Sequence, residues 1–168
     1  MKRKIRVFDF DDTLVKTECT VTVKHSSGAV TILLPHEFAT YRRMEGDIFD
    51  FSGFADVTNP IAKRHDVVLK RLLKRTDSDI VILTARDSRA REAILAYLSQ
   101  TYGNTSKVQV VTLGSSEAFD KAIWLKKEVQ LKGYTDVYFC DDSWANCRAV
   151  GDMLHEMPQI TKLKIQKV

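Results

Sequence analysis

The sequence predicts an α/β fold, a three-layer sandwich with a central, mostly parallel sheet and a β-hairpin flap after the first strand. Short apolar runs alternate with segments of helical periodicity, which is typical of parallel strands covered by helices. Residues 18–59 break that alternation. With 168 residues, 44% of them hydrophobic, the chain can bury a sizeable core. We therefore expect one domain over 1–168, with 18–59 as a hairpin flap and irregular insertion.

The expected strands are five apolar runs, at residues 5–10, 79–84, 108–113, 137–140 and 163–168. The first four runs are almost continuously apolar, as in strands that are buried on both faces. Four segments with helical spacing of apolar residues separate them, at residues 61–75, 88–101, 115–132 and 143–157. Gly133 is placed to end the third helix.

The insertion begins with two strand-like runs, residues 20–25 and 29–34, around Ser26, Ser27 and Gly28. Such a pattern predicts a β-hairpin. Residues 35–60 show little periodicity, so we expect an irregular segment there. Its aromatic residues, among them Tyr41 and Phe49, favour packing over disorder.

Composition excludes several classes of protein. The three cysteines lack the spacing of metal-ligand pairs, which argues against a zinc site or a disulfide framework and favours a reducing compartment. The basic start at residues 1–4 precedes an apolar run too short for a leader peptide, and no stretch is long enough to span a membrane. We expect a cytoplasmic protein with no membrane partner. Its net charge of +4 is compatible with phosphate-rich partners, and the oligomeric state is left open.

Polar side chains gather where the predicted strands end, and in such sheets active sites lie at the carboxyl ends of the strands. The residues concerned are Asp9, Asp11, Asp12 and Thr13, then Thr84 and Arg86, and finally Asp141 and Asp142. Lys121 lies in the helix before the last pair. Crowded carboxylates can attack phosphorus or hold a hard cation such as Mg²⁺. The alternative for the first cluster alone is a functionless acidic turn.

The order of these motifs resembles that of the haloacid dehalogenase-like (HAD) phosphohydrolase superfamily. Its DxDxT motif is matched by residues 9–13, and its single threonine, its lysine and its acidic pair by Thr84, Lys121 and Asp141–Asp142. Asn146 follows the acidic pair, as in that superfamily. The resemblance implies a Rossmann-like sheet and a Mg²⁺-dependent phosphatase.

The resemblance also implies roles. Asp9 would be the nucleophile and Asp11 the general acid and base, while Thr84 and Lys121 would hold the phosphoryl oxygens. Thr13 and Arg86 would contact the substrate. The Mg²⁺ site would use Asp9, Asp11 through its backbone carbonyl, and Asp142, with Asp141 either a direct ligand or a partner behind the ligands.

Each residue also has a structural interpretation. Thr84 could cap a helix, and Lys121 could be a solvated lysine, with a neighbouring lysine in its place. Asp12 fits an exposed turn, and Arg86 could make a local cap or ion pair. Asn146 could face solvent, although the motif favours a hydrogen bond to a metal-binding aspartate.

The substrate class follows from what is missing between motifs. The segment between Thr84 and Lys121 is too short for a large cap domain. In that superfamily, the lack of such a cap implies an open site for bulky substrates. Arg86 two residues after Thr84, with the Asp141–Asp142 pair, is similar to the polynucleotide 3′-phosphatase domains of phage end-healing enzymes. However, Asp12 stands where those domains often have glycine.

We therefore expect a phosphomonoester hydrolase that acts through an aspartyl-phosphate intermediate on nucleotide or polynucleotide 3′-phosphate ends. The alternatives are a phosphatase for a small metabolite or a phosphoprotein, and a catalytically idle binding module. Basic residues of the predicted 61–75 helix could form a nucleic-acid track, but a solvated helix face is the favoured interpretation. They are Lys63, Arg64, Lys70, Arg71, Lys74 and Arg75.

Overall fold

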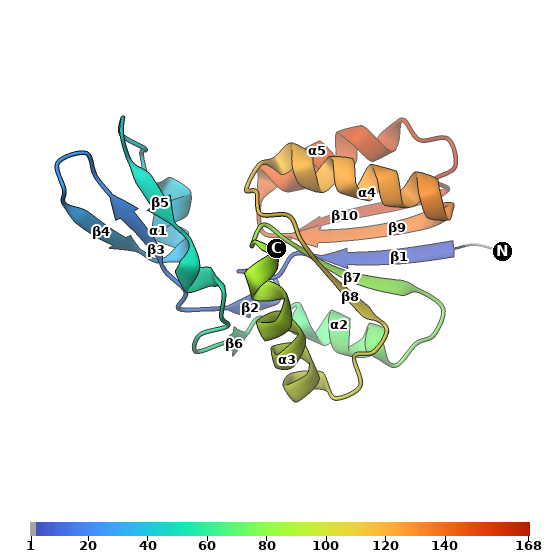
Figure 1. The fold of residues 1–168 in the computed structure, drawn as a ribbon. Coiled ribbons are helices and arrows are strands. Elements are labelled where there is room, and N and C mark those ends of the chain that lie inside the picture. Colours follow the sequence, from blue (N-terminus) through green and yellow to red (C-terminus); the bar gives the residue numbers. More distant parts are fainter. Residues whose placement is uncertain (1–2) are drawn as a thin grey trace.

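The computed structural model describes residues 3–168, and its centre is a five-stranded sheet with helices on both faces (Figure 1). The strand order is β10–β9–β1–β7–β8, and every neighbouring pair is parallel. The strands are β1 (Arg3–Phe8), β7 (Asp79–Thr84), β8 (Val108–Thr112), β9 (Tyr134–Asp141) and β10 (Lys162–Lys167). The predicted α/β class and parallel sheet are confirmed.

Two helices cover each face of this sheet, as Figure 1 shows. On one face, α4 (Ala118–Lys132) and α5 (Trp144–His155) pack residues such as Leu125 and Val150 against Val137. On the other, α2 (Asp66–Leu73) and α3 (Arg91–Tyr102) pack Leu69 and Ile94 against the sheet. A 3-10 turn, η2 (Ser88–Ala90), leads into α3. Because apolar side chains leave both faces of β1, β7 and β9, the strands are buried between two cores.

The insertion forms a small lobe beyond the carboxyl edge of the sheet (Figure 1). The expected hairpin is present as β3 (Val21–Lys24) and β4 (Val30–Leu33), which pair antiparallel, and β5 (Ile48–Asp50) joins β3 on its other side. Val21, Val23 and Leu33 form a small core there.

The prediction that residues 35–60 are irregular was wrong in part. They contain α1 (Pro35–Thr40), β5 and a 3-10 turn, η1 (Ser52–Phe54). Pro35 occupies the first turn of α1, and the Glu37 carboxylate accepts the Leu34 N–H at 2.7 Å. A helix of this length is too short for its periodicity to be recognised in the sequence.

A second correction concerns residues 61–75, which were expected to be one helix. Residues Ile61–Ala62 form β6, which pairs antiparallel with β2 (Val15–Lys16), and α2 begins only at Asp66. The Lys63 N–H donates to the Leu14 carbonyl at 2.8 Å, so tertiary pairing overrides local helical preference. We call this two-strand connection the clasp.

Other boundaries differ by a few residues. β9 begins at Tyr134 rather than at residue 137, because Thr135 and Asp136 interrupt the apolar run without interrupting the strand. Phe10 lies after β1, in the turn that carries the acidic residues.

Among residues 3–168, no helix combines the length and the apolar character that crossing a membrane requires.

Candidate active site

Neighbouring strands bring Asp9 and Asp141 together. Phe8 in β1 is in register with Cys140 in β9, and the Asp9 N–H donates to the Cys140 carbonyl at 2.9 Å. The parallel strands therefore deliver two acidic side chains at the same edge of the sheet, one residue past the last paired positions. Both are buried, with 5% of Asp9 and none of Asp141 exposed.

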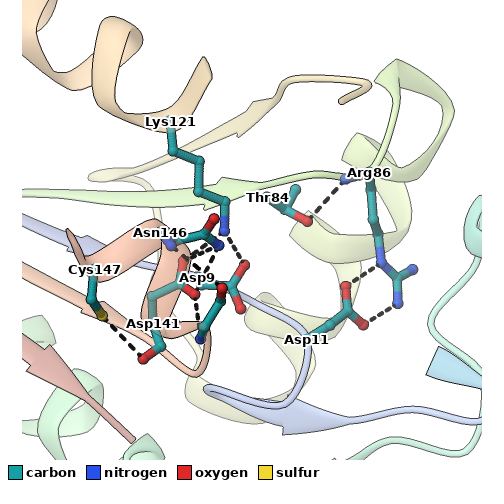
Figure 2. A network of polar contacts seen from close by, with 9 residues as sticks. Asp9, Asp11, Thr84, Arg86, Lys121, Asp141, Asn146 and Cys147 are labelled. Carbon is teal, nitrogen blue, oxygen red and sulfur yellow. Dashed lines mark hydrogen bonds and ion pairs between the residues drawn. The ribbon is translucent and has the colours of Figure 1, made fainter. Parts of the chain in front are cut away.

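Lys121 lies between these two carboxylates (Figure 2). Its Nζ is 2.7 Å from Asp9 Oδ1 and 2.7 Å from Asp141 Oδ2. The side chain projects from the first turns of α4 and is 3% exposed, so the interpretation of Lys121 as a solvated lysine was wrong. An ammonium group at this depth is tolerated because two carboxylates face it.

Asp141 is held on several sides. Asn146 Nδ2 lies 2.9 Å and 3.1 Å from its two carboxylate oxygens, and the Ser143 N–H donates to Oδ1 at 2.9 Å. Asn146 therefore reaches an acidic residue rather than solvent. With Lys121 on Oδ2 as well, the oxygens of Asp141 have few free lone pairs. Asp142, next in the chain, has more freedom to bind an ion directly.

The carboxylates outnumber the cation beside them. Asp9, Asp141 and Asp142 each offer an oxygen, and these oxygens lie within 4.8 Å of one another. Burial raises the pKa of Asp9; the ammonium of Lys121 opposes this, and the charges of Asp141 and Asp142 add to it. Burial also raises the pKa of Asp142, again with help from Asp141. Burial works against the charge of Lys121, but Asp9 and Asp141 outweigh it and raise its pKa.

This cluster fits a divalent, oxygen-seeking cation. Hard cations such as Mg²⁺ prefer carboxylate and carbonyl oxygens, and an added positive charge would relieve the repulsion among three acids that share one ammonium group. The donor set contains no sulfur or imidazole, so it is unsuited to a zinc centre.

Asp11 faces a different partner, Arg86 (Figure 2). Arg86 Nε donates to Asp11 Oδ2 at 2.8 Å, and Nη2 donates to Oδ1 at 2.7 Å. The same guanidinium donates through Nη1 to the carbonyls of Phe54 and Asp56, at 2.9 Å and 2.5 Å. Arg86 is only 5% exposed, so it joins the DxDxT turn to the end of the lobe.

Two residues near Asp11 were not singled out in the sequence. Thr17 Oγ1 donates to Asp11 Oδ1 at 3.2 Å, and Arg86 Nη2 reaches Thr17 Oγ1 and Cys19 Sγ at 3.2 Å and 3.3 Å. Both residues lie where the chain leaves β2 for the lobe. No spacing or motif marks them, because their meeting with Arg86 depends on how the lobe folds back.

The remaining expected residues lie around this edge. Thr84 is buried at the end of β7, and its hydroxyl accepts the Arg86 N–H at 3.2 Å. Thr13 is fully buried, and its hydroxyl has no hydrogen-bond partner among the described residues. Asp12 has a φ of 58° and lies 3.8 Å from the Lys63 ammonium, as suits a turn residue.

Comparisons with known proteins add a likeness of fold. No family model matches the sequence, and no curated protein matches it. Among solved structures, it is similar to a chain in the structure of the Pnkp1/Rnl/Hen1 RNA repair complex, with a TM-score of 0.51 and 13% identity. The match covers 99% of this chain and 43% of the other, so this chain spans less than half of that chain's length. At this identity the likeness concerns the fold alone.

Proposed function

We propose that this protein is a Mg²⁺-dependent phosphomonoester hydrolase of the haloacid dehalogenase-like superfamily, acting through an aspartyl-phosphate intermediate. One observation carries the proposal: Lys121 bridges Asp9 and Asp141 at 2.7 Å each, at the carboxyl ends of adjacent parallel strands. A buried carboxylate beside an ammonium group and two further acids is suited to receive a phosphoryl group and its counter-cation.

The chain's own residues then divide the chemistry. An Asp9 carboxylate oxygen attacks phosphorus, the bond from phosphorus to the leaving oxygen breaks, and Asp11 gives that oxygen a proton. In the second half, Asp11 takes a proton from water, which attacks phosphorus and releases Asp9 and inorganic phosphate. Lys121 balances the charge of Asp9 throughout. Mg²⁺ would be held by Asp9 and Asp142, with Asp141 behind them and the Asp11 backbone carbonyl alongside, and would supply neutralisation of the phosphate charge.

Arg86 constrains how Asp11 can act. Both carboxylate oxygens of Asp11 accept N–H groups from Arg86, so Asp11 can act as an acid only after one oxygen has exchanged this donor for a proton from solvent. It then gives that proton to the leaving oxygen of the substrate. The freed N–H group would be available to a phosphate oxygen, because a guanidinium fork suits paired anionic oxygens. Arg86 thus serves first to hold Asp11 and then to contact substrate.

We propose a nucleotide or polynucleotide 3′-phosphate end as the substrate, and two observations support a nucleic acid end as its class. The chain between Thr84 and Lys121 consists of η2, α3, β8 and short connections, which leaves no cap domain on that side of the site. The likeness of fold is to a chain of an RNA repair complex, which makes a nucleic acid end the first class to test.

The test is phosphate release in Mg²⁺ and in EDTA, comparing the wild type with Asp9→Asn. The substrates are p-nitrophenyl phosphate, mononucleotides, and oligonucleotides phosphorylated at the 3′ or the 5′ end. We expect Mg²⁺-dependent release that falls to background in Asp9→Asn, with 3′-phosphorylated ends preferred. Glu156→Gln, an exposed position at the end of α5, is the matched control and should keep full activity.

Equal release by Asp9→Asn and the wild type would overturn the mechanism. No release from any substrate by a folded, Mg²⁺-loaded protein would favour a binding module. Preference for p-nitrophenyl phosphate or a mononucleotide over every oligonucleotide would keep the mechanism and reject the polynucleotide end.

A further inference from the structure

Two large aromatic side chains are exposed beside the candidate site. Phe119 in the first turn of α4 is 62% exposed, and Trp144 in the first turn of α5 is 71% exposed. Each is two residues from a site residue, Phe119 from Lys121 and Trp144 from Asp142. Exposing rings of this size to water is unfavourable. Exposed aromatic patches therefore mark sites at which a binding partner covers the rings.

Trp144 lies in a ridge with grooves on either side. Trp144 and Arg148 are one helical turn apart in α5, and both line each groove. One groove, of about 490 Å³, is completed by Ile165 and Lys167 of β10, and the other, of about 480 Å³, by Phe119 of α4. We call the surface formed by Phe119, Trp144, Arg148 and Lys167 the α5 platform.

The α5 platform lies at the same sheet edge as the acidic cluster. Lys167 is in register with Asp141 at the carboxyl end of the sheet. In the first turn of α5, Asn146 points toward Asp141 and Trp144 points toward solvent. The same helical turn therefore contributes one residue to the site and one to the platform. Figure 1 shows α4 and α5 side by side on one face of the sheet.

The two cations of the α5 platform are available to a ligand. Arg148 and Lys167 are exposed, and among residues 3–168 neither has an acidic partner within ion-pair distance. The basic residues near α2, an alternative track for nucleic acid, differ only in part. Lys70 is paired with Asp66 and Arg75 with Asp77, each within 3 Å. Arg64, Arg71 and Lys74 are exposed and, within residues 3–168, have no acidic partner at ion-pair distance, so charge alone does not separate the two surfaces. The exposed rings of Phe119 and Trp144 favour the platform as the surface for a single strand.

We propose that the α5 platform binds the nucleotides of a single-stranded nucleic acid that lie next to its phosphorylated end. A base would stack on Trp144, and Arg148 and Lys167 would contact backbone phosphates, since stacking on aromatic rings together with a basic groove is how single strands are bound without sequence preference. This site for the strand rests on the proposed function, but binding of a strand to the platform can be measured without hydrolysis.

The first experiment measures binding without catalysis. Labelled, unphosphorylated single-stranded oligonucleotides of DNA and RNA are titrated with protein in EDTA, and binding is followed by fluorescence anisotropy. We expect Trp144→Ala to weaken binding by about ten-fold. Trp144→Phe should stay within about two-fold of the wild type, because it keeps a ring for stacking. The control Leu131→Ala, an exposed apolar position at the far end of α4, should not change the affinity.

The second readout is salt dependence. Arg148→Gln and Lys167→Gln should each lower the slope of log affinity against log salt by about 0.7, the value expected for one phosphate contact to a single strand. Trp144→Ala should weaken binding while leaving that slope unchanged. Melting curves of each variant in buffer check that the fold is retained.

The proposed function and the platform fail in distinguishable ways. Unchanged affinity in Trp144→Ala overturns the platform, even where phosphate release from p-nitrophenyl phosphate is intact. Loss of affinity in Trp144→Ala supports the platform, even where no substrate is hydrolysed. Concentration-dependent dimers that Trp144→Ala abolishes, without any effect on oligonucleotide affinity, would identify the surface as a contact between copies of the chain and overturn the inference.

Discussion

Lys121 gives up nearly all contact with water to lie between two carboxylates. Its ammonium group faces the carboxylates of both Asp9 and Asp141, so removing Lys121 leaves two buried carboxylates without their partner. Removing one member of a buried ion pair is usually far more costly than replacing the whole pair. The residues proposed to be catalytic are therefore expected to affect stability as well.

Lys121→Met should lower the free energy of unfolding by about 3 kcal/mol in EDTA, because Asp9 and Asp141 are then left unneutralised. Urea denaturation measures this loss. Adding Asp9→Asn to Lys121→Met should recover part of the lost stability. Additive losses in the double variant would show that the two side chains do not interact.

A second ion pair links β1 to β9 away from the site. Arg6 Nη1 is 2.7 Å from Asp136 Oδ1, and the hydrogen bond from Arg6 lowers the pKa of Asp136. A carboxyl whose pKa is lower in the folded state contributes stability above its unfolded pKa, about 3.9, and loses that contribution as the pH falls through the folded pKa.

Asp136→Asn should therefore lower the free energy of unfolding by about 1 kcal/mol at pH 7. The difference from the wild type should shrink as the pH falls below about 4, because the unfolded chain then takes up a proton at this carboxyl while the folded state still holds it ionised. Denaturant titrations across this pH range measure it. A difference between Asp136→Asn and the wild type that stays constant across this pH range would contradict the assignment.

At the scale of residues, sequence reasoning identified the groups at the strand ends because parallel strands deliver their ends to one edge. Asp9, Lys121, Asp141 and Asn146 do meet there. The contact of Arg86 with Asp11 and with two lobe carbonyls was not predicted, since it depends on the fold of a segment without periodicity.

Among the elements, the central strands and α3 to α5 were predicted within a few residues, because their apolar patterns are long and regular. The lobe was predicted least well. α1 is short and β5 gains its pairing only from β3, so neither has a local signature. β6 was taken for the start of a helix, because its pairing with β2 is a tertiary contact.

Two glycines in the helical layer should respond in opposite directions to the same substitution. Gly133 ends α4 with a φ of +66°, whereas Gly151 lies within α5, where an added Cβ would meet Ile165 Cγ1 at 3.8 Å. Gly133→Ala should destabilise the protein by about 1 kcal/mol because of its left-handed backbone. Gly151→Ala should stabilise it by about 0.5 kcal/mol.

Urea denaturation of the two variants in parallel measures both changes. Each variant is the other's control for the chemistry of adding one methyl group. A gain in stability for Gly133→Ala would show that α4 does not need a left-handed residue at its end.

For the molecule as a whole, the acidic cluster should link folding to Mg²⁺. A ligand that binds only the folded state stabilises it by about 2.7 kcal/mol when present at about 100 times its Kd. The melting temperature should therefore rise with Mg²⁺ concentration. In Asp142→Asn this rise should be largely lost, because one of the three carboxylates of the cluster is gone.

Thermal melts in EDTA and in graded Mg²⁺ give the result, and Glu156→Gln should respond like the wild type. An equal rise in Asp142→Asn and in the wild type would place the ion elsewhere on the molecule. This readout is independent of any substrate, so it tests the proposed metal site separately from the proposed phosphatase activity.

The clasp has a consequence for how such a chain can diversify. Val15 pairs with Ala62 and Lys16 with Ile61, so the chain leaves for the lobe and returns from it at one point. Because the ends of the inserted segment lie together, insertions, deletions or replacements within the lobe can accumulate during evolution without altering the strand order of the central sheet. The hydrogen bonds from Arg86 to the Phe54 and Asp56 carbonyls limit the exchange to the residues before them. Under the proposed function, selection for new substrates can then act on the lobe while the residues at the strand ends stay unchanged.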